Sequence, residues 1–120
     1  APGSLAALAP PAPAPAALAP AGPTPPAPSP QVAGLLRRAD AMLAVGDVSA
    51  ARLLYGRAAQ AGSAEAMLGL GKSHDPRFLA GIGVRGLQGD AATAILWYRR
   101  ALAQGAAEAA EGLQRNGAAP

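Results

Sequence analysis

The sequence predicts an all-α fold, a short α-solenoid of about two helix-pair repeats preceded by a disordered Pro/Ala-rich segment. Three observations predict this fold. Residues 1–30 have a composition that does not favour folding, apolar residues recur at spacings of three and four along residues 31–116, and one segment of the chain is repeated 43 positions later.

Residues 1–30 contain 11 Pro, 11 Ala and no charged side chain. Such a segment cannot bury enough varied apolar surface to offset the chain entropy lost on folding, and proline also removes backbone hydrogen-bond donors. We therefore expect residues 1–30 to be a disordered or polyproline-like linker, residues 31–116 to form the folded domain, and residues 117–120 to be a flexible tail. Because the chain begins at Ala1 rather than Met, we expect it to be a processed or partial product.

The charged residues are confined to the part of the chain that is expected to fold. All ten Lys and Arg and all seven Asp and Glu lie in residues 31–120, which therefore carry the whole net charge of +3. The isoelectric point near 10.2 reflects the predominance of arginine rather than a concentration of charge on one face. The absence of cysteine excludes a disulfide framework and a thiolate metal site. No apolar run approaches the roughly 18 residues that a membrane span needs, so we expect no membrane insertion within this chain.

The first helix is expected over residues 31–45, with Ser29 as its N-cap and Pro30 at its first position. Its apolar stripe consists of Val32, Leu35, Leu36, Ala39 and Leu43. Gly46 ends this helix and Asp47 caps the next one. The other helices are expected over residues 48–61, 63–73, 90–104 and 106–115.

The internal repeat aligns residues 46–70 with residues 89–113, with 13 identities in 25 positions and no gap. Low complexity could match alanine with alanine, but it does not explain the matched glycine, aspartate, tyrosine and arginine positions. The signature residues are Gly46, Asp47, Tyr55 and Gly62 in the first copy and Gly89, Asp90, Trp97, Tyr98 and Gly105 in the second. Each copy predicts a Gly-Asp turn and cap, a helix, a glycine break and a shorter Ala-rich helix, and such pairs bury their apolar stripes by stacking.

Small and aromatic residues of the repeat are interpreted as packing positions. The small residues Ala51, Ala58, Ala94 and Ala101 recur at the inward spacing. They predict that antiparallel helices approach to about 8 Å. Trp97 aligns with Leu54 of the first copy, and a position that accepts either residue is acting in packing. We expect Trp97 at the edge of the inward stripe, in a cation–π contact with Arg100 one turn further on.

The segment "AMLGLG…GIGVRGLQGDAATAILWYRRALAQGAAEAAEGL" resembles the Sel-like repeat, a tetratricopeptide-like helical repeat. The resemblance covers one full unit from Ala66 to Leu113 and the second half of another before it, and it departs from the pattern where "KSHDPRFLA" is inserted before the glycine turn. It implies a superhelical adaptor that holds protein partners, commonly in bacterial envelope or signalling systems. A periplasmic or cell-envelope location follows from the resemblance alone, with the cytoplasm as the alternative.

Two short motifs match the sequence patterns of known functional sites but lack the structural context that those sites need. "GIGVRG", from Gly81 to Gly86, matches the dinucleotide fingerprint, but a helical segment precedes it where a strand is needed. Three consecutive side chains such as "SHD", from Ser73 to Asp75, cannot form a catalytic relay. We expect Asp75 to cap a short helix, "PRFLAG", that packs Phe78 and Leu79 onto the domain. No cofactor, metal or small-molecule substrate is expected, and a single His is a poor metal site.

The candidate binding surface is basic. If the first helices line the concave side, a set of cations gathers there: Arg37, Arg38, Lys72, His74 and Arg77. This surface suits an acidic protein or peptide. Nucleic acid is not expected as the partner, because no stacking platform or known module accompanies the charge.

The leading functional hypothesis is a non-catalytic interaction module, an adaptor or scaffold tethered by the Pro/Ala-rich linker. No constellation of catalytic groups supports an enzyme. The alternative hypothesis is structural, a terminal piece of a longer solenoid or a self-associating repeat that forms a homo-oligomer without a separate ligand. Two units are fewer than the roughly three that usually give independent stability, which favours missing repeats or a dimer.

Overall fold

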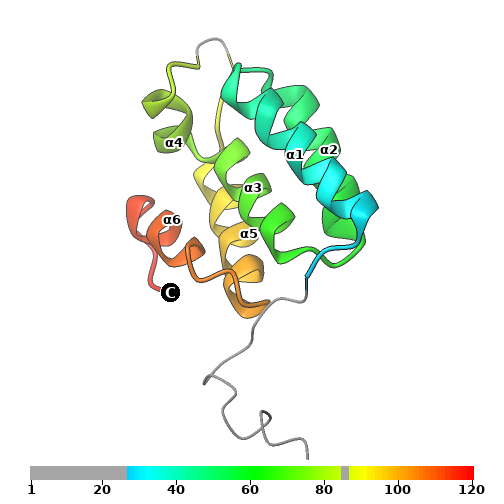
Figure 1. The fold of residues 1–120 in the computed structure, drawn as a ribbon. Helices are drawn as coiled ribbons and strands as arrows, with labels where there is room; N and C mark the ends of the chain where they lie inside the picture. Colours follow the sequence, from blue (N-terminus) through cyan, green and yellow to red (C-terminus); the bar gives the residue numbers. More distant parts are fainter. Residues whose placement is uncertain (1–26, 85–86) are drawn as a thin grey trace, which may run out of the picture.

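All regular secondary structure in the described part of the chain is helical (Figure 1). The computed structural model describes residues 27–84 and 87–120. In these two ranges the helices are α1 (Pro30–Ala44), α2 (Val48–Gln60), α3 (Ala64–His74), α4 (Pro76–Gly81), α5 (Ala91–Ala103) and α6 (Ala109–Arg115). The predicted all-α class is confirmed. Of the linker expected over residues 1–30, positions 1–26 lie outside the described residues.

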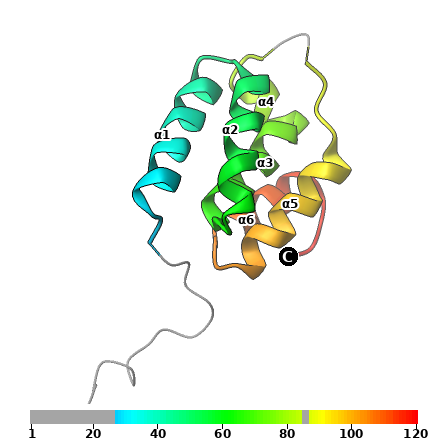
Figure 2. The same cartoon turned by 90° about the vertical axis from the view of Figure 1, so that its right-hand side faces the viewer.

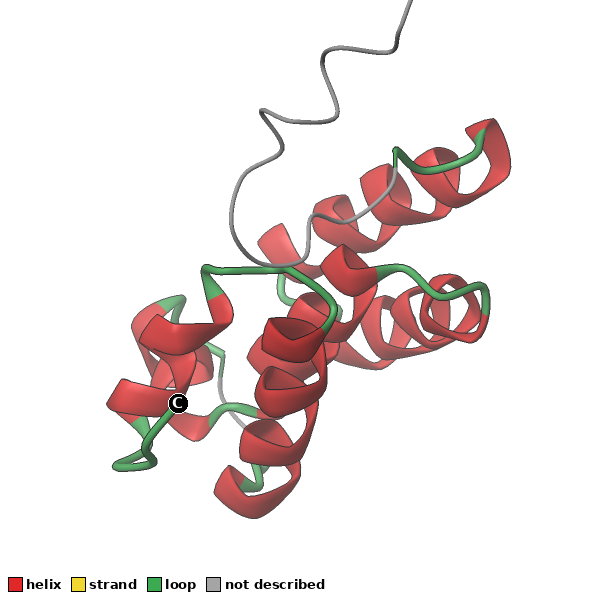
Figure 3. Cartoon of the chain, turned by 90° about the horizontal axis from the view of Figure 1, so that it is seen from below, coloured by secondary structure: helices red, strands yellow, loops and turns green. Residues whose placement is uncertain are grey.

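The main helices form two layers. Helices α1, α3 and α6 make one layer, and α2 and α5 make the other, as the two perpendicular views show (Figures 1 and 2). Helix α2 packs against both α1 and α3, and α5 packs against both α3 and α6. Figure 3 shows from below that helices and loops alone make up the described chain. Each helix of the second layer therefore lies between two helices of the first.

The helices begin at the side chains that the sequence predicts as caps. Ser29 Oγ accepts the backbone N–H of Val32 at 3.2 Å, with Pro30 in the first turn of α1. Asp47 Oδ1 accepts the N–H of Ala50 at 3.1 Å at the start of α2. Asp90 caps α5 in the same way, because its Oδ1 accepts the N–H of Ala92 at 3.1 Å. These hydrogen bonds satisfy amide groups that have no partner within the helix.

The two repeat copies share a tyrosine that packs on a glycine. Tyr55 on α2 and Tyr98 on α5 are both buried. A Cβ added at Gly69 would lie 2.5 Å from Tyr55 Cζ, and one added at Gly112 would lie 2.5 Å from Tyr98 Cε2. The predicted inward alanines are Ala51, Ala58, Ala94 and Ala101, and all four are fully buried. Helix pairs thus approach closely at small residues, and each tyrosine ring occupies the space that a methyl group would fill.

The two ends of the insertion between α3 and α5 lie close together in space. The N–H of Asp90 donates to the carbonyl of His74 at 2.7 Å. A Cβ on Gly89 would lie 2.7 Å from that same oxygen and from Pro76 Cα, so only glycine fits there. Leu79 of α4 is buried in the core, and Phe78 packs against it, as the sequence predicts. The insertion therefore adds a short helix without displacing α5 from α3.

Helix α6 begins later than the sequence predicts, at Ala109 instead of residue 106. The equivalent helix of the first copy, α3, is capped by Ser63, whose Oγ accepts the N–H of Ala66 at 3.1 Å. The repeat places Ala106 at the position of Ser63, and α6 has no side-chain cap. The first turn of residues 106–111 instead closes through backbone bonds of three-residue spacing, beginning with Ala109 N–H to Ala106 O at 3.0 Å.

Restoring the missing cap should stabilise the protein. The substitution Ala106→Ser is expected to raise the free energy of unfolding by about 0.5–1 kcal/mol, because serine can accept an orphan amide of the α6 first turn. Ser63→Ala in the first copy should lower it by about 1 kcal/mol. Urea unfolding followed by circular dichroism measures both. An unchanged midpoint for Ala106→Ser would contradict this account of where α6 begins.

The C-terminal residues remain attached to the fold beyond the expected boundary at residue 116. The N–H of Ala118 donates to the carbonyl of Leu113 at 2.8 Å, and the Ala118 side chain packs on the core around Tyr98. Gly117, between them, has a φ of +73°. Ala118 of the predicted flexible tail, residues 117–120, therefore contacts the fold, because a helix that ends at a glycine folds the next residue back onto its last turn.

Candidate functional site

A groove of about 450 Å³ lies between the two helices of the second layer. We call it the α2–α5 groove. Its walls and floor are Arg52, Gly56, Ala59 and Gln60 of α2, Met67, Leu70 and His74 of α3, and Trp97 and Arg100 of α5. On each helix these residues are spaced by one, three or four positions, so each helix presents a single face to the groove.

Arg52 is held in position by the end of α3. Its Nε and Nη2 donate to the backbone carbonyl of Ser73 at 3.1 and 2.6 Å. This carbonyl belongs to the last turn of α3, where backbone acceptors have no partner within the helix. Partial burial lowers the pKa of Arg52 from its usual value, and the side chain remains charged. The guanidinium is thus a fixed positive charge on one wall of the groove.

Trp97 and Arg100 form the opposite wall. The guanidinium carbon of Arg100 lies 5.0 Å from the centroid of the Trp97 ring, which confirms the cation–π contact expected from the sequence. Trp97 is half-buried and packs against the core. Its ring therefore anchors the Arg100 side chain, and both residues line the groove.

His74 contributes a neutral imidazole to the floor at pH 7. Burial lowers its pKa below the usual 6.5, and the neighbouring Arg52 guanidinium lowers it further. The carboxylate of Asp90 acts in the opposite direction but does not reverse the shift. Protonation of His74 below pH 6.5 would place a third positive charge in the groove.

The charges that line the α2–α5 groove have one sign. Arg52 and Arg100 are cationic, and no carboxylate is among the described residues that line it. A concave surface with positive charge on both walls and an aromatic edge attracts acidic groups. The groove therefore has the charge to attract acidic groups, and its described lining includes no nucleophile paired with a base.

The predicted cationic set is divided among different surfaces of the fold. His74 lines the α2–α5 groove, while Lys72 lines hollows beside Asp40 of α1. Two positions on a helix are about 200° apart, so Lys72 and His74 point in nearly opposite directions. Lys72 Nζ also lies 3.0 Å from Glu108 Oε2 and 5.7 Å from the centre of the Phe78 ring. Its charge is therefore already paired.

The three remaining residues of that set lie on the surfaces of α1 and α4. Arg37 and Arg38 are exposed on α1, and Arg38 lines a hollow between α1 and α2. Arg77 is exposed on α4. The single basic surface expected from the sequence thus becomes separate surfaces, because neighbouring positions on one helix face different sides.

Sequence reasoning did not assign Arg52, Gly56 or Arg100 to a groove. A signal was present in the repeat alignment. Positions 52, 56 and 59 carry Arg, Gly and Ala in the first copy, but Ile, Arg and Leu stand at positions 95, 99 and 102 of the second. The two copies therefore differ in chemistry at the positions where the first copy faces the groove.

Asp75 is the centre of a buried polar cluster rather than part of a catalytic relay. Its Oδ1 accepts the N–H groups of Arg77 and Phe78 at 2.9 and 3.2 Å, which confirms the predicted cap of α4. Its Oδ2 accepts the Tyr98 hydroxyl at 2.8 Å and Arg115 Nε at 3.3 Å. The neighbouring Ser73 hydroxyl donates to the carbonyl of Leu70 at 2.8 Å. The residues of "SHD" thus have separate roles.

The hydrogen bonds of this cluster set the ionisation of its members. Burial alone would raise the pKa of Asp75, but the bonds from the Tyr98 hydroxyl and the α4 amides outweigh burial and lower the pKa below the usual 3.8. Burial and the bond to Asp75 raise the pKa of Tyr98. Asp75 is therefore ionised and Tyr98 neutral across the physiological range.

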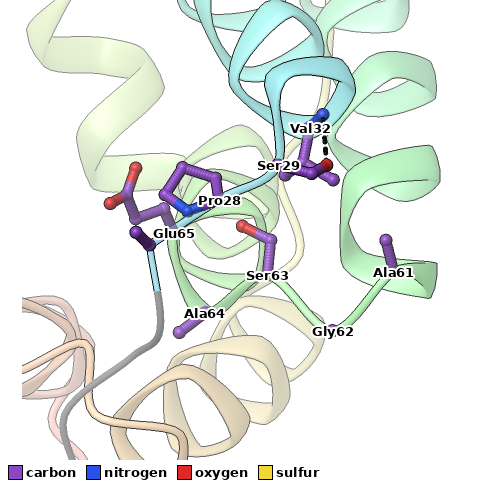
Figure 4. Close-up of a pocket in the computed structure, with 9 residues that line it drawn as sticks. Pro28, Ser29, Val32, Ala61, Gly62, Ser63, Ala64 and Glu65 are labelled. Carbon is purple, nitrogen blue, oxygen red and sulfur yellow. Dashed lines mark hydrogen bonds between the residues drawn. The ribbon is translucent and has the colours of Figure 1, made fainter.

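A smaller hollow, of about 180 Å³, lies where the N-terminal segment meets the α2–α3 turn (Figure 4). Pro28 and Ser29 line one side, and Ser63 and Glu65 line the other. Both serine hydroxyls accept helix amides as caps. The start of the domain therefore lies against the α2–α3 turn at this hollow, and the two serine hydroxyls cap the helices there.

The glycine-rich motif follows a helix. Helix α4 ends at Gly81, and Val84 N–H donates back to the carbonyl of Leu79 at 3.0 Å. Arg85 and Gly86 lie outside the described residues. No strand delivers these glycines in the described ranges, as a dinucleotide site requires.

No family model, curated protein or solved structure matches the chain. Within the described ranges, none of the helices has the length and apolarity to cross a membrane. Function is therefore inferred from the residues of the chain itself.

Proposed function

We propose that the helical region is a non-catalytic protein–protein interaction module, a short Sel-like or tetratricopeptide-like solenoid tethered by the Pro/Ala-rich segment. The observation that carries the proposal is the α2–α5 groove, which lies between equivalent helices of the two repeat copies and has a fixed arginine on each wall. The internal repeat and the shared tyrosine–glycine packing support the repeat architecture. The module presents a rigid concave face to its partner.

The partner is an acidic segment of another protein. Carboxylates of such a segment pair with Arg52 and Arg100, and an apolar side chain contacts the indole edge of Trp97. The backbone carbonyl that holds Arg52 fixes its guanidinium before binding, which lowers the entropy lost on association. Cell-envelope location is proposed on the resemblance to Sel-like repeats alone, and fractionation of the full gene product tests it.

Trp97 provides a direct test because it is the only Trp in the chain and lines the groove. A Trp-free, Glu-rich peptide of 12 residues should change Trp97 fluorescence, whereas the matched Lys-rich peptide should not. Arg100→Glu should weaken binding by at least about tenfold, since attraction at one wall becomes repulsion.

The matched control for that experiment is Arg99→Glu. Arg99 is exposed on the same helix and does not line the groove. Arg99→Glu changes the net charge by the same amount as Arg100→Glu. It should bind the Glu-rich peptide nearly as well as the parent chain. Equal weakening by both variants would show general electrostatic attraction and would refute a groove site.

Self-association is the second candidate. Leu53 on α2 and Leu96 on α5 occupy the same repeat position, and 59% and 49% of their surfaces are exposed. Exposed leucines at equivalent positions favour contacts between copies. Light scattering over a range of concentrations discriminates, because a chain that stays monomeric at the highest concentration excludes this candidate.

A further inference from the structure

The hollow between α1 and α2 that Arg38 lines has a volume of about 350 Å³. We call it the end face. It is lined by Arg38, Ala41 and Met42 of α1 and by Ala50, Leu53, Leu54 and Arg57 of α2. Leu53 is the most exposed of its large apolar side chains. Helix α1 is the first in the described chain, and the α1–α2 pair lies at the opposite side of the molecule from α6 (Figure 1).

The internal repeat shows that this surface corresponds to one wall of the α2–α5 groove. Leu54 and Arg57 of the end face stand at the repeat positions of Trp97 and Arg100, which line the α2–α5 groove. In the second copy these positions face a helix, α2, across the groove. In the first copy no described helix precedes α1 to stand opposite them. The end face is therefore the counterpart of the α5 wall of the α2–α5 groove, with no described helix opposite it.

The side chains that line the end face indicate which kind of partner it fits. The exposed Leu53 and the half-buried Met42 supply an apolar strip, and Leu54, which is buried in the core, lines the hollow beside them. Arg38 from α1 and Arg57 from α2 are exposed cations at this face, and no carboxylate is among the described residues that line it. We propose that the end face docks an amphipathic helix of a partner protein, with an apolar stripe flanked by Asp or Glu.

A second copy of this chain is a poor occupant. The opposite end of the repeat presents α5, where Ile95, Arg99 and Leu102 stand at the positions of Arg52, Gly56 and Ala59. Stacking one copy on another would bring Arg99 towards the two arginines of the end face, and like charges repel. Ile95 and Leu102 also pack already against the core of their own chain. Charge complementarity thus selects an acidic helix from a different protein.

The test uses the full chain and a fluorescein-labelled, stapled 16-residue helix with a leucine stripe and Glu on both flanks. Leu53→Ser and Arg57→Glu should each weaken binding, measured by fluorescence anisotropy, by about tenfold or more. Leu96→Ser is the matched control, because Leu96 has the same repeat position and similar exposure but lies outside the end face. It should leave the affinity unchanged. Replacing the Glu residues of the probe with Lys should abolish binding.

Failure of this test is distinguishable from failure of the groove proposal. The end-face probe should leave Trp97 fluorescence unchanged and should not compete with the Glu-rich peptide, since Trp97 lines the other hollow. Equal effects of Leu53→Ser and Leu96→Ser, or a probe with Lys that binds as well as one with Glu, would overturn the proposal. So would a parent chain that is dimeric in light scattering and becomes monomeric with Leu53→Ser. Circular dichroism of each variant verifies the fold.

Discussion

Replacing Asp75 with alanine is expected to lower the free energy of unfolding by about 2–4 kcal/mol. Asp75 is fully buried, and its two oxygens accept hydrogen bonds from the start of α4, from Tyr98 on α5 and from Arg115 on α6. Alanine removes the cap of α4 and leaves the buried Tyr98 hydroxyl without its acceptor. Three helices lose a common anchor, which is why the effect should exceed that of an ordinary cap.

Two variants separate the contributions of this cluster. Asp75→Asn keeps the side-chain shape and one carbonyl oxygen, so it should be less destabilising than alanine. Tyr98→Phe removes the hydroxyl and leaves the ring in place. In a double-mutant cycle, Asp75→Ala and Tyr98→Phe should show a coupling energy of about 0.5–3 kcal/mol. Additive effects in urea unfolding would mean that the hydrogen bond between them does not stabilise the fold.

The lowered pKa of Asp75 gives the same cluster a pH dependence. The unfolded chain binds the Asp75 proton with a pKa near 3.8, and the folded chain binds it at lower pH. The stabilisation is therefore complete above pH 3.8 and is lost as the pH falls through the folded pKa. Asp75→Asn should lose less stability in this window than the parent chain. His74 adds a separate decline below pH 6.5, because the unfolded chain takes up that proton first.

Local features of the fold could be predicted from the sequence. The capping aspartates and serine bond to amides within three residues of their own position, so the local sequence is enough to predict these caps. Periodicity placed Trp97 at the edge of the inward stripe beside Arg100, and the structure confirms the contact between them. The late start of α6 could also have been read from the loss of serine at position 106.

Long-range features could not be predicted in this way. Asp75 was expected as a cap, but Tyr98 and Arg115 lie 23 and 40 residues further along the chain. The α2–α5 groove draws residues from three helices, and its shape depends on how α2 and α5 lie on α3. The expected basic surface failed for a simpler reason. Lys72 and His74 were grouped on the expectation that the first helices line one concave side, but residues two positions apart on one helix point about 200° away from each other.

The two proposed binding surfaces share one repeat position. Arg57 lines the end face and Arg100 lines the α2–α5 groove, and the two arginines occupy the same position in the two repeat copies. The residue beside each differs, since Leu54 stands where Trp97 does in the second copy. A common cation with a different apolar neighbour gives two surfaces that attract acidic partners and distinguish them by shape.

Replacing Gly112 with alanine is expected to lower the free energy of unfolding by about 2–3 kcal/mol or more. The added Cβ would lie 2.5 Å from Tyr98 Cε2, far inside van der Waals contact. The ring has little room to move away, because it also packs directly on Gly71 of α3, where an added Cβ would lie 2.5 Å from Tyr98 Cδ1, and because Asp75 accepts its hydroxyl. The better helix propensity of alanine, about 1 kcal/mol, does not offset this overlap.

The control for this prediction is another helical glycine. A Cβ at Gly56, in the middle of α2, meets nothing within 4 Å, so Gly56→Ala should raise the free energy of unfolding by about 0.5–1 kcal/mol. The two substitutions are chemically identical and should have opposite signs in urea unfolding. In a Tyr98→Leu background the cost of Gly112→Ala should largely disappear, because the ring that it meets is gone. A persistent cost there would place the strain in the α6 backbone instead of in the tyrosine–glycine contact that the two repeat copies share.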